Sequence, residues 1–423
     1  MTKKSDAPAI RFKGFSDAWE QRKFDEVFDC TVPNNTLSRA ELSYDEGTVL
    51  NVHYGDVLIK YGSVLDVQKD DIPRIPHRCR EDFNGALLQD GDVIIADTAE
   101  DETTGKACEI GNLQGSAIVS GLHTMVCRPR NRMALGYLGY YLNSNAYHHQ
   151  LLPLMQGIKV LSLSRSNIQK TSVSYPIAVK EQQLIAYYFS QLDNLITLHQ
   201  RKFEKLTNVK KSMLEKMFPQ NGSSYPEIRF KGFTDPWEQR KLGDVVKEIT
   251  RNDPESEAPI MMITANNGFI EQSERYAFNN AGESLKKYIL LKKGELAYNH
   301  GASKLRPYGS CFALTTAENA RIPFVYHCFS AENQNAEFMS IELNGAEIEN
   351  QLRKIVSSGA RMDGLLNISF DEYTSVSVIL PGTEEQDRIA DFFRHLDNLI
   401  TLHQRELEKL QNIKKSMLEK MFV

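Results

Sequence analysis

The ten residues LDNLITLHQR occupy positions 192–201 and recur without change at positions 396–405. A second identical pair follows them, because KKSMLEKMF stands at 210–218 and again at 414–422. Nearer the start of each half, RFKGFSDAWEQRK at 11–23 matches RFKGFTDPWEQRK at 229–241. Self-similarity of this extent, with the segments in the same order, predicts that the chain contains two copies of one structural unit.

Each LDNLITLHQR copy lies in a stretch whose apolar residues recur every three or four positions, which is the pattern of an amphipathic helix. We expect one long helix over residues 181–218 and a second over 383–423. Two helices with nearly the same apolar face should pair, and the intervening stretch of about 160 residues is long enough for an antiparallel return. The expected helix-pairing and partner-docking positions are Leu192, Ile196, His199, Leu206 and Met213 in the first helix, and Leu396, Ile400, His403, Leu410 and Met417 in the second.

The stretches between the repeated segments are less regular. Runs at 49–62 and 117–127 predict strands, and the run at 137–153 predicts a helix. The expected fold class is α+β, with two mixed α/β domains in a pseudo-twofold repeat, separated by two long antiparallel coiled-coil helices. The expected segments are 1–180 for the first domain, 181–218 for the first helix, 219–226 for a polar linker, 227–382 for the second domain and 383–423 for the second helix.

The composition limits the classes of function. A net charge of −5 over 423 residues argues against a protein that coats nucleic acid indiscriminately, although it leaves room for a local basic surface. The six cysteines are dispersed without a CxxC pair, so neither a zinc site nor a disulfide framework is indicated. The N-terminus has no signal-peptide pattern and no run is long and apolar enough to span a bilayer, which predicts a cytoplasmic protein without a membrane partner.

Catalytic motifs are missing from the sequence. It contains neither the phosphate-binding pattern GxxxxGK[ST] nor the Asn-Pro-Pro-aromatic segment expected of an adenine methyltransferase. One acidic and basic group could be interpreted as a nuclease cluster or, more simply, as a solvated loop: Asp97, Asp101, Glu102 and Lys106. The histidines at 148–149 and in NHG at 299–301 similarly suit either a metal or general-base site or ordinary turns. We therefore expect no catalytic residue, no metal and no cofactor.

The head motif RFKGF[ST]DxWEQRK, the twin helices EQ…IAxxFxxLDNLITLHQR and the repeated KKSMLEKMF resemble the specificity subunits of type I restriction-modification systems over the full length of the chain. This resemblance implies two target-recognition domains, each reading one half of a split site in double-stranded DNA. It also implies that the two long helices act as a ruler and as docking sites for two adenine methyltransferase subunits, with a motor-nuclease subunit completing the complex. The specificity subunit itself would have no catalytic role.

Base reading requires side chains that enter the DNA grooves, whereas contacts to phosphates position each domain. Polar and basic residues are the candidates where they lie in turn-like segments of the two bodies, which are the expected domains 1–180 and 227–382 without the long helices. The expected DNA-binding residues are Thr103, Thr104, Lys106, Lys159, Ser162, Ser164 and Arg165 in the first body, and Ser303, Lys304, Arg306 and Arg361 in the second. The lysines at 205, 210, 211 and 216 either touch DNA or keep the helix face soluble.

Two other classes of function stay open at this point. The chain could be a non-catalytic coiled-coil scaffold that joins two protein-binding domains without touching DNA. It could also be an autonomous methyltransferase or nuclease, although it lacks the corresponding motifs.

Overall fold

The structure, a computed structural model, describes residues 7–265, 268–275, 282–356 and 365–423. The chain divides into two compact units. Unit 1 comprises Met1–Arg201 and Gln404–Val423, and unit 2 comprises Lys202–His403. Each unit therefore contains the beginning of one long helix and the end of the other, which the linear order of the segments did not suggest.

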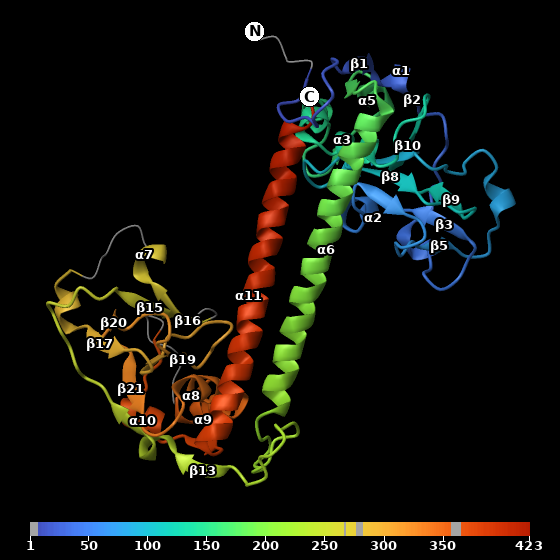
Figure 1. Cartoon of the computed structure of the whole chain (residues 1–423). Helices are drawn as coiled ribbons and strands as arrows, with labels where there is room; N and C mark the ends of the chain where they lie inside the picture. The colour runs from blue at the N-terminus through green and yellow to red at the C-terminus, as the bar shows by residue number, and fades with distance from the viewer. Residues whose placement is uncertain (1–6, 266–267, 276–281, 357–364) are drawn as a thin grey trace. The chain divides into compact units, whose positions relative to one another are not determined.

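The long helices are α6 (Val179–Lys216) and α11 (Thr383–Lys420), each of 38 residues. In unit 1 they lie side by side (Figure 1), where the ring of Phe189 stacks on Phe422 and Lys414 bonds to Asp193 at 2.5 Å. Residue numbers thus rise along α6 while they fall along α11, so the two segments are antiparallel.

Unit 2 repeats this arrangement with the helices exchanged. The ring of Phe393, near the start of α11, lies 6.2 Å from that of Phe218 at the end of α6. Lys210 bonds to Asp397 at 2.5 Å, which is the counterpart of the Lys414–Asp193 pair in unit 1. The antiparallel pairing expected from the apolar stripes is therefore present within each unit.

The two bodies share a core topology. Unit 1 has a five-stranded sheet in the order β2-β10-β6-β8-β4, and unit 2 has a four-stranded sheet in the order β14-β21-β18-β19. The first four positions correspond, so the duplication extends to the bodies, whose sequences match only faintly. The β1·β12 pair in unit 1 likewise corresponds to the β13·β22 pair in unit 2.

The strands of unit 1 are β1 (Glu20–Lys23), β2 (Phe28–Asp29), β3 (Val49–Val52), β4 (Val64–Asp66), β5 (Arg74–Ile75), β6 (Val93–Ala96), β7 (Thr98–Ala99), β8 (Ala107–Gly111), β9 (Ala117–Ser120), β10 (Thr124–Pro129), β11 (Leu161–Ser162) and β12 (Ser172–Tyr175). Its short helices are α1 (Phe24–Val27), α2 (Tyr54–Ile59), α3 (Tyr137–Leu142), α4 (Asn145–His148) and α5 (Arg165–Ile168).

The strands of unit 2 are β13 (Glu238–Lys241), β14 (Val246–Glu248), β15 (Met261–Thr264), β16 (Gly268–Glu271), β17 (Ile289–Lys292), β18 (Leu296–Asn299), β19 (Ser310–Ala313), β20 (Asn319–Ile322), β21 (His327–Ala331) and β22 (Ser377–Leu380). Its short helices are α7 (Gln272–Arg275), α8 (Ala336–Leu343), α9 (Ala346–Ile355) and α10 (Phe370–Thr374).

Strand β6 is buried on both faces of its sheet. Val93 and Ile95 belong to the apolar cluster that also includes Phe189 and Phe422, whereas Ile94 belongs to a second cluster. Alternate side chains of a strand point to opposite faces, so a continuous apolar run such as VIIA is what a strand covered on both sides requires.

The local predictions from sequence were partly right. The run at 117–127 forms β9 and β10 as expected, but only the first part of 49–62 is a strand, because His53 caps α2 by accepting a hydrogen bond from Gly55 N–H. The predicted helix at 137–153 is broken after Leu142. There the side chain of Asn143 bonds to the backbone of Ala107, which ties the chain to β8 and ends the helix.

A buried carboxyl group links β8 to α3 and makes the stability of unit 1 depend on pH. Glu109 is 1% exposed and accepts a hydrogen bond from Gly139 N–H at 2.8 Å. Burial raises the pKa of Glu109 to about 7. In the unfolded chain this carboxyl titrates near its ordinary value, so between the two pKa values only the folded state holds the proton. The contribution of this group to stability therefore falls as the pH rises through that window.

We expect Glu109→Gln to raise the melting temperature of unit 1 at pH 8 and to leave it nearly unchanged at pH 5. The difference should be on the order of 3 kcal/mol, because each pKa unit corresponds to about 1.4 kcal/mol. Calorimetry at the two pH values measures it, with the exposed Glu26→Gln as the matched control. Equal changes in melting temperature at both pH values would show that Glu109 does not carry this dependence.

Candidate nucleic-acid interface

Two loops that are far apart in sequence come together in unit 1. The loop at 97–106, between β6 and β8, contains β7, which pairs antiparallel with β11. Leu163 N–H also donates to the carbonyl of Asp97 at 2.8 Å. The two groups of expected DNA-binding residues in this body thus share one surface region, a proximity that their separation in sequence did not reveal.

The first loop needs a glycine at 105. Gly105 has a φ of +91°, and a Cβ atom there would lie 2.6 Å from a methyl carbon of Leu151. The loop therefore combines a left-handed turn with close packing on the body, and both conditions favour glycine.

The expected DNA-binding residues of unit 1 have two different environments. Those with exposed side chains are Thr103, Lys159, Ser162, Ser164 and Arg165. Thr104, by contrast, is fully buried, and its hydroxyl donates to the carbonyl of Asp101 at 2.9 Å. The expectation that Thr104 faces DNA is thus wrong, because this side chain holds the loop from inside.

Lys106 is directed to the body as well. Its ammonium group donates to the carbonyls of Leu58 at 2.9 Å and Tyr61 at 3.2 Å, near the end of α2. Burial lowers the pKa of Lys106. A cation that satisfies the last carbonyls of a helix stabilises the fold, and this role explains the lysine without a DNA contact.

A third loop joins this region, and no motif in the sequence pointed to it. His123, in the turn between β9 and β10, has a φ of +52° and lies 3.3 Å from the carboxylate of Asp97. Its ring is also 5.3 Å from that of Tyr54, at the start of α2. The surface therefore includes exposed His123 beside the two loops chosen from sequence.

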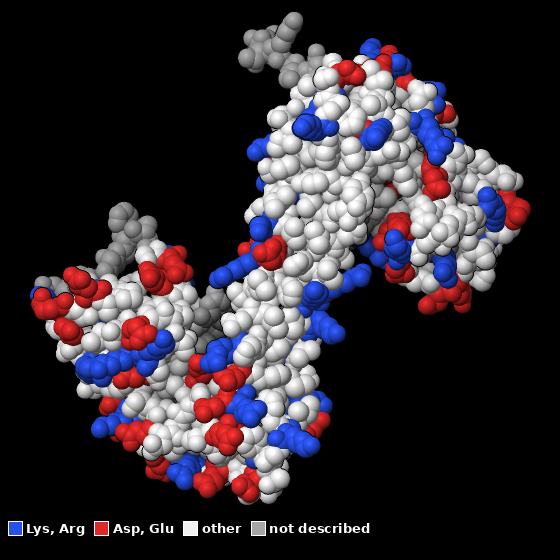
Figure 2. Space-filling view, viewed as in Figure 1, with Lys and Arg blue, Asp and Glu red and all other residues white. Residues whose placement is uncertain are grey.

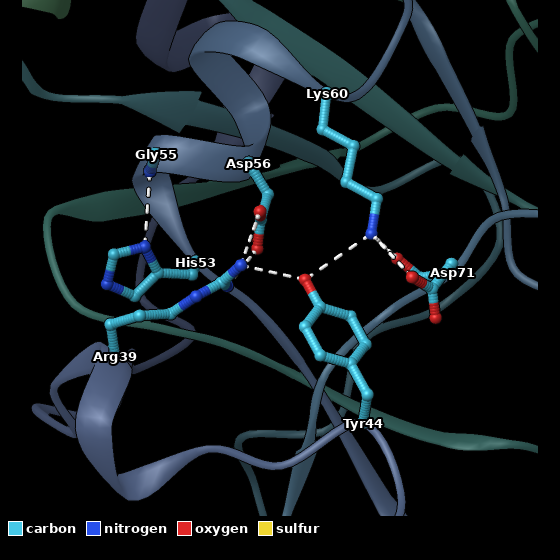
Figure 3. Close-up of polar contacts among 7 residues, drawn as sticks. All are labelled: Arg39, Tyr44, His53, Gly55, Asp56, Lys60 and Asp71. Atoms are coloured by element: carbon cyan, nitrogen blue, oxygen red, sulfur yellow. Dashed lines mark hydrogen bonds and ion pairs between the residues drawn. The ribbon is translucent and has the colours of Figure 1, made fainter. Parts of the chain in front are cut away.

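Next to Tyr54, a network of charges fixes α2 to the segments before and after it (Figure 3). Arg39 forms a bidentate pair with Asp56, at 2.6 and 3.1 Å, and donates to the hydroxyl of Tyr44 at 2.7 Å. Lys60 donates to the same hydroxyl at 3.3 Å and pairs with Asp71. Each cation has its own carboxylate, so the network is neutral and we interpret it as a support for α2.

His53 stands beside this network in a fixed tautomer. Its Nδ1 accepts the hydrogen bond from Gly55 N–H at 3.2 Å (Figure 3). In the neutral ring the proton is therefore on Nε2. Burial lowers the pKa of His53, which favours the neutral form.

In unit 2 the corresponding loop follows β18. Leu366 N–H donates to the carbonyl of His300 at 2.9 Å, which repeats the Leu163–Asp97 bond of unit 1. Ser303 and Lys304 are exposed in this loop, in agreement with a surface role. The expected contact at Arg361 lies outside the described residues.

Arg306 has a different environment from its loop neighbours. One of its terminal nitrogens donates to the carbonyl of Asn344, at the end of α8, at 2.8 Å. Burial lowers the pKa of Arg306. Like Lys106 in unit 1, this cation stabilises the end of a helix, so the expectation that it faces DNA is not supported by its position.

Two of the three histidines considered for metal binding or base catalysis, His148 and His300, hold loops. His148 Nε2 lies 2.7 Å from the carbonyl of Glu102, and the two ring nitrogens of His300 lie 2.8 Å from the carbonyl of Leu366 and 2.7 Å from that of Val325. Across the described residues, no group of three or more His, Cys, Asp or Glu side chains is arranged to hold a metal ion.

The helix positions chosen from sequence divide between core and surface. Leu192 and Leu396 are buried in the cores of units 1 and 2. Four residues are partly buried against those cores: Leu410 and Met417 in unit 1, Leu206 and Met213 in unit 2. The positions of intermediate exposure are Ile196, His199, Ile400 and His403. Leucines between these positions stay exposed: Leu195 and Leu198 on α6, Leu399 and Leu402 on α11.

Charged residues are mixed over the visible face of each unit. Lys and Arg side chains are interspersed there with Asp and Glu (Figure 2), as the small net charge suggests. Two lysines of the basic run on α6 are paired, Lys210 with Asp397 and Lys216 with Glu227.

Among the helices of the described chain, none combines the length and the apolar character needed to cross a membrane.

Comparison with known proteins gives the same family twice along the chain. The family model for the type I restriction modification DNA specificity domain matches residues 16–208 and 234–412. A protein of Methanocaldococcus jannaschii, described as the MjaX type I restriction enzyme specificity subunit, is 22% identical over 95% of this chain and 92% of its own length. The MjaVIII specificity subunit of the same organism is 25% identical over 57% of this chain and 59% of its own length.

The fold is also similar to a solved structure. The crystal structure of a type I restriction-modification system S subunit from M. genitalium matches with a TM-score of 0.60 at 12% identity, covering 99% of both chains. Since the family model covers most of this sequence in two successive copies, the chain belongs to the type I restriction-modification DNA specificity family.

Proposed function

We propose that each unit reads one half of a bipartite site in double-stranded DNA. The observation that carries this proposal is the repeated loop arrangement on matching sheets, with the Leu163–Asp97 bond in unit 1 and the Leu366–His300 bond in unit 2. The frame is the same, but the exposed side chains differ between the units. Two readers of common architecture and different surface chemistry are what an asymmetric, split site requires.

The exposed residues of these loops are the proposed DNA contacts. In unit 1 they are Thr103, Lys159, Ser162, Ser164 and Arg165, and in unit 2 they are Ser303 and Lys304. Hydroxyl groups can donate to or accept from base edges, and the cations suit phosphates or guanine. Arg361 keeps its place in the proposal from sequence alone.

The chain would direct chemistry that partner subunits perform. Leu195 and Leu198 on α6 are 43% and 45% exposed, and the same two leucines of the repeat, Leu399 and Leu402 on α11, are 44% and 52% exposed. Identical exposed apolar positions in both copies favour two identical partners, which we propose are adenine methyltransferase subunits. A motor-nuclease subunit would complete the restriction complex. The long helices would set the spacer between the half-sites, because helical rise per residue is fixed.

Methylation assays test this division of labour. We expect the purified chain alone to transfer no methyl group to DNA, and the chain combined with its methyltransferase subunit to methylate adenines at a split site. Sequencing of methylated adenines in cells with and without the gene identifies that site. Methyl transfer by the rigorously purified chain would contradict the proposal.

A binding assay separates this proposal from a pure scaffold. The assembled complex should shift a duplex that contains the identified site more strongly than a duplex in which either half is scrambled. A complex that assembles but shows no preference between these duplexes would favour the scaffold instead.

A further inference from the structure

A narrow hairpin projects from the proposed DNA-binding surface of unit 1. Gln156 and Ser162 form its base by exchanging two backbone hydrogen bonds, at 3.0 and 2.8 Å. Gly157 has a φ of +130°, and a Cβ atom there would lie 1.8 Å from the carbonyl oxygen of Val160. Only glycine fits this position, so the tip at residues 157–160 has a tightly defined shape.

The side chains at the tip are apolar and unusually exposed. Ile158 is 100% exposed, the highest value for a large hydrophobic side chain in the described part of the chain, and Val160 is 50% exposed. Lys159 lies between them and is also exposed. An exposed apolar tip has no structural benefit for the isolated unit, because its burial would be favourable.

The base of the hairpin is firmly supported. Residues 161–162 form β11, which pairs with β7, and the next apolar residue, Leu163, is 4% exposed. The side-chain amide of Asn167, in α5, donates to the carbonyl of Leu154 at 3.2 Å, on the other side of the hairpin. A rigid base positions the tip accurately, which a loop that only covers the surface would not need.

We propose that Ile158 is a wedge that enters a groove of the bound duplex and inserts between neighbouring bases, while Lys159 contacts an adjacent phosphate. This inference deepens the proposed function and rests on it. An isoleucine makes no hydrogen bond to a base edge, so its gain on DNA comes from apolar contact, and the interior of the base stack is the most apolar part of a duplex. Its β-branched side chain has few rotamers, which suits insertion.

The experiment uses the chain assembled with its methyltransferase subunits and a duplex containing the identified site. 2-Aminopurine, whose fluorescence rises when it is unstacked, replaces single adenines in or beside the half-site that unit 1 reads, except the adenine that is methylated, because a methyltransferase flips its target base out of the stack. We expect fluorescence to rise at one step on binding. Ile158→Ala should abolish the rise and weaken binding roughly tenfold, whereas Ile158→Leu should preserve both. Lys159→Ala should keep the fluorescence rise when the duplex is saturated with the complex. It should also reduce the slope of the logarithm of the binding constant against the logarithm of the salt concentration by about one unit.

Ile59→Ala is the matched control, because Ile59 is an isoleucine on α2 that is 87% exposed. A complex with this variant should bind the duplex with the same affinity, and give the same rise in 2-aminopurine fluorescence, as the unmodified complex. The wedge proposal is wrong if the unmodified complex prefers its site but no 2-aminopurine position gains fluorescence on binding. It is also wrong if Ile158→Ala matches Ile59→Ala in affinity and fluorescence. In both cases the proposed function stands. If the unmodified complex shows no preference for the site, the proposed function itself fails.

Discussion

Truncating Phe422, the residue next to the C-terminus, is expected to destabilise the unit that contains the N-terminus. Its ring lies 6.3 Å from that of Trp19, 5.7 Å from that of Tyr141 and 5.7 Å from that of Phe189, and it is 4% exposed. Phe422→Ala should cost about 3 to 5 kcal/mol, because it removes a large buried side chain and leaves a cavity. Hydrogen exchange should then rise in α3 and in the beginning of α6.

The chain provides its own control for this prediction. Phe218, at the end of α6, is the equivalent residue, and its ring lies 5.8 Å from that of Trp237 and 5.7 Å from that of Phe338. Phe218→Ala should raise hydrogen exchange in unit 2 and spare unit 1. The swapped packing would be refuted if each substitution weakened the unit that contains the start of its own helix.

Exchanging one body should change one half of the DNA site completely and leave the other half unchanged. We expect this result when residues 25–171 are replaced by the corresponding segment of a homologous specificity subunit with a different known site. The cut points lie just after β1 and just before β12, so the β1·β12 pair, the long helices and unit 2 are retained. Sequencing of methylated adenines in cells that express the chimera measures the outcome.

A reciprocal chimera sharpens this test. Replacing residues 243–376, between β13 and β22, should change only the other half-site. Altered sequence in both halves after either replacement would show that the two units do not read DNA independently.

The sequence was sufficient to predict the duplication, the amphipathic helices and their antiparallel pairing, because these depend on local periodicity and on identity between segments. The run at 117–127, which forms β9 and β10, was also recognisable as strand. Prediction was weaker where a single side chain redirects the backbone. His53 turns the end of a strand-like run into a helix, and Asn143 interrupts a helical one.

The candidate interface could be predicted only in outline. Two groups of polar residues were chosen from sequence, but the pairing of β7 with β11 that joins them is a long-range contact. Whether a polar residue faces solvent also depends on its neighbours. Thr104, Lys106 and Arg306 turn inward to satisfy backbone carbonyls, while Lys159 is exposed.

Which helix end packs on which body was decided by the tertiary structure alone. The segment KKSMLEKMF is identical in both copies. The head motif that it packs against, which contains the tryptophan, differs between the copies at only two positions. The identity of the two copies therefore could not distinguish packing on the same copy from packing on the other one, because the outcome depends on whether each helix is continuous, which the structure shows. A continuous helix of 38 residues cannot bring its end back to its own beginning, because every residue advances it by about 1.5 Å. The end of α6 therefore completes unit 2, and the end of α11 completes unit 1.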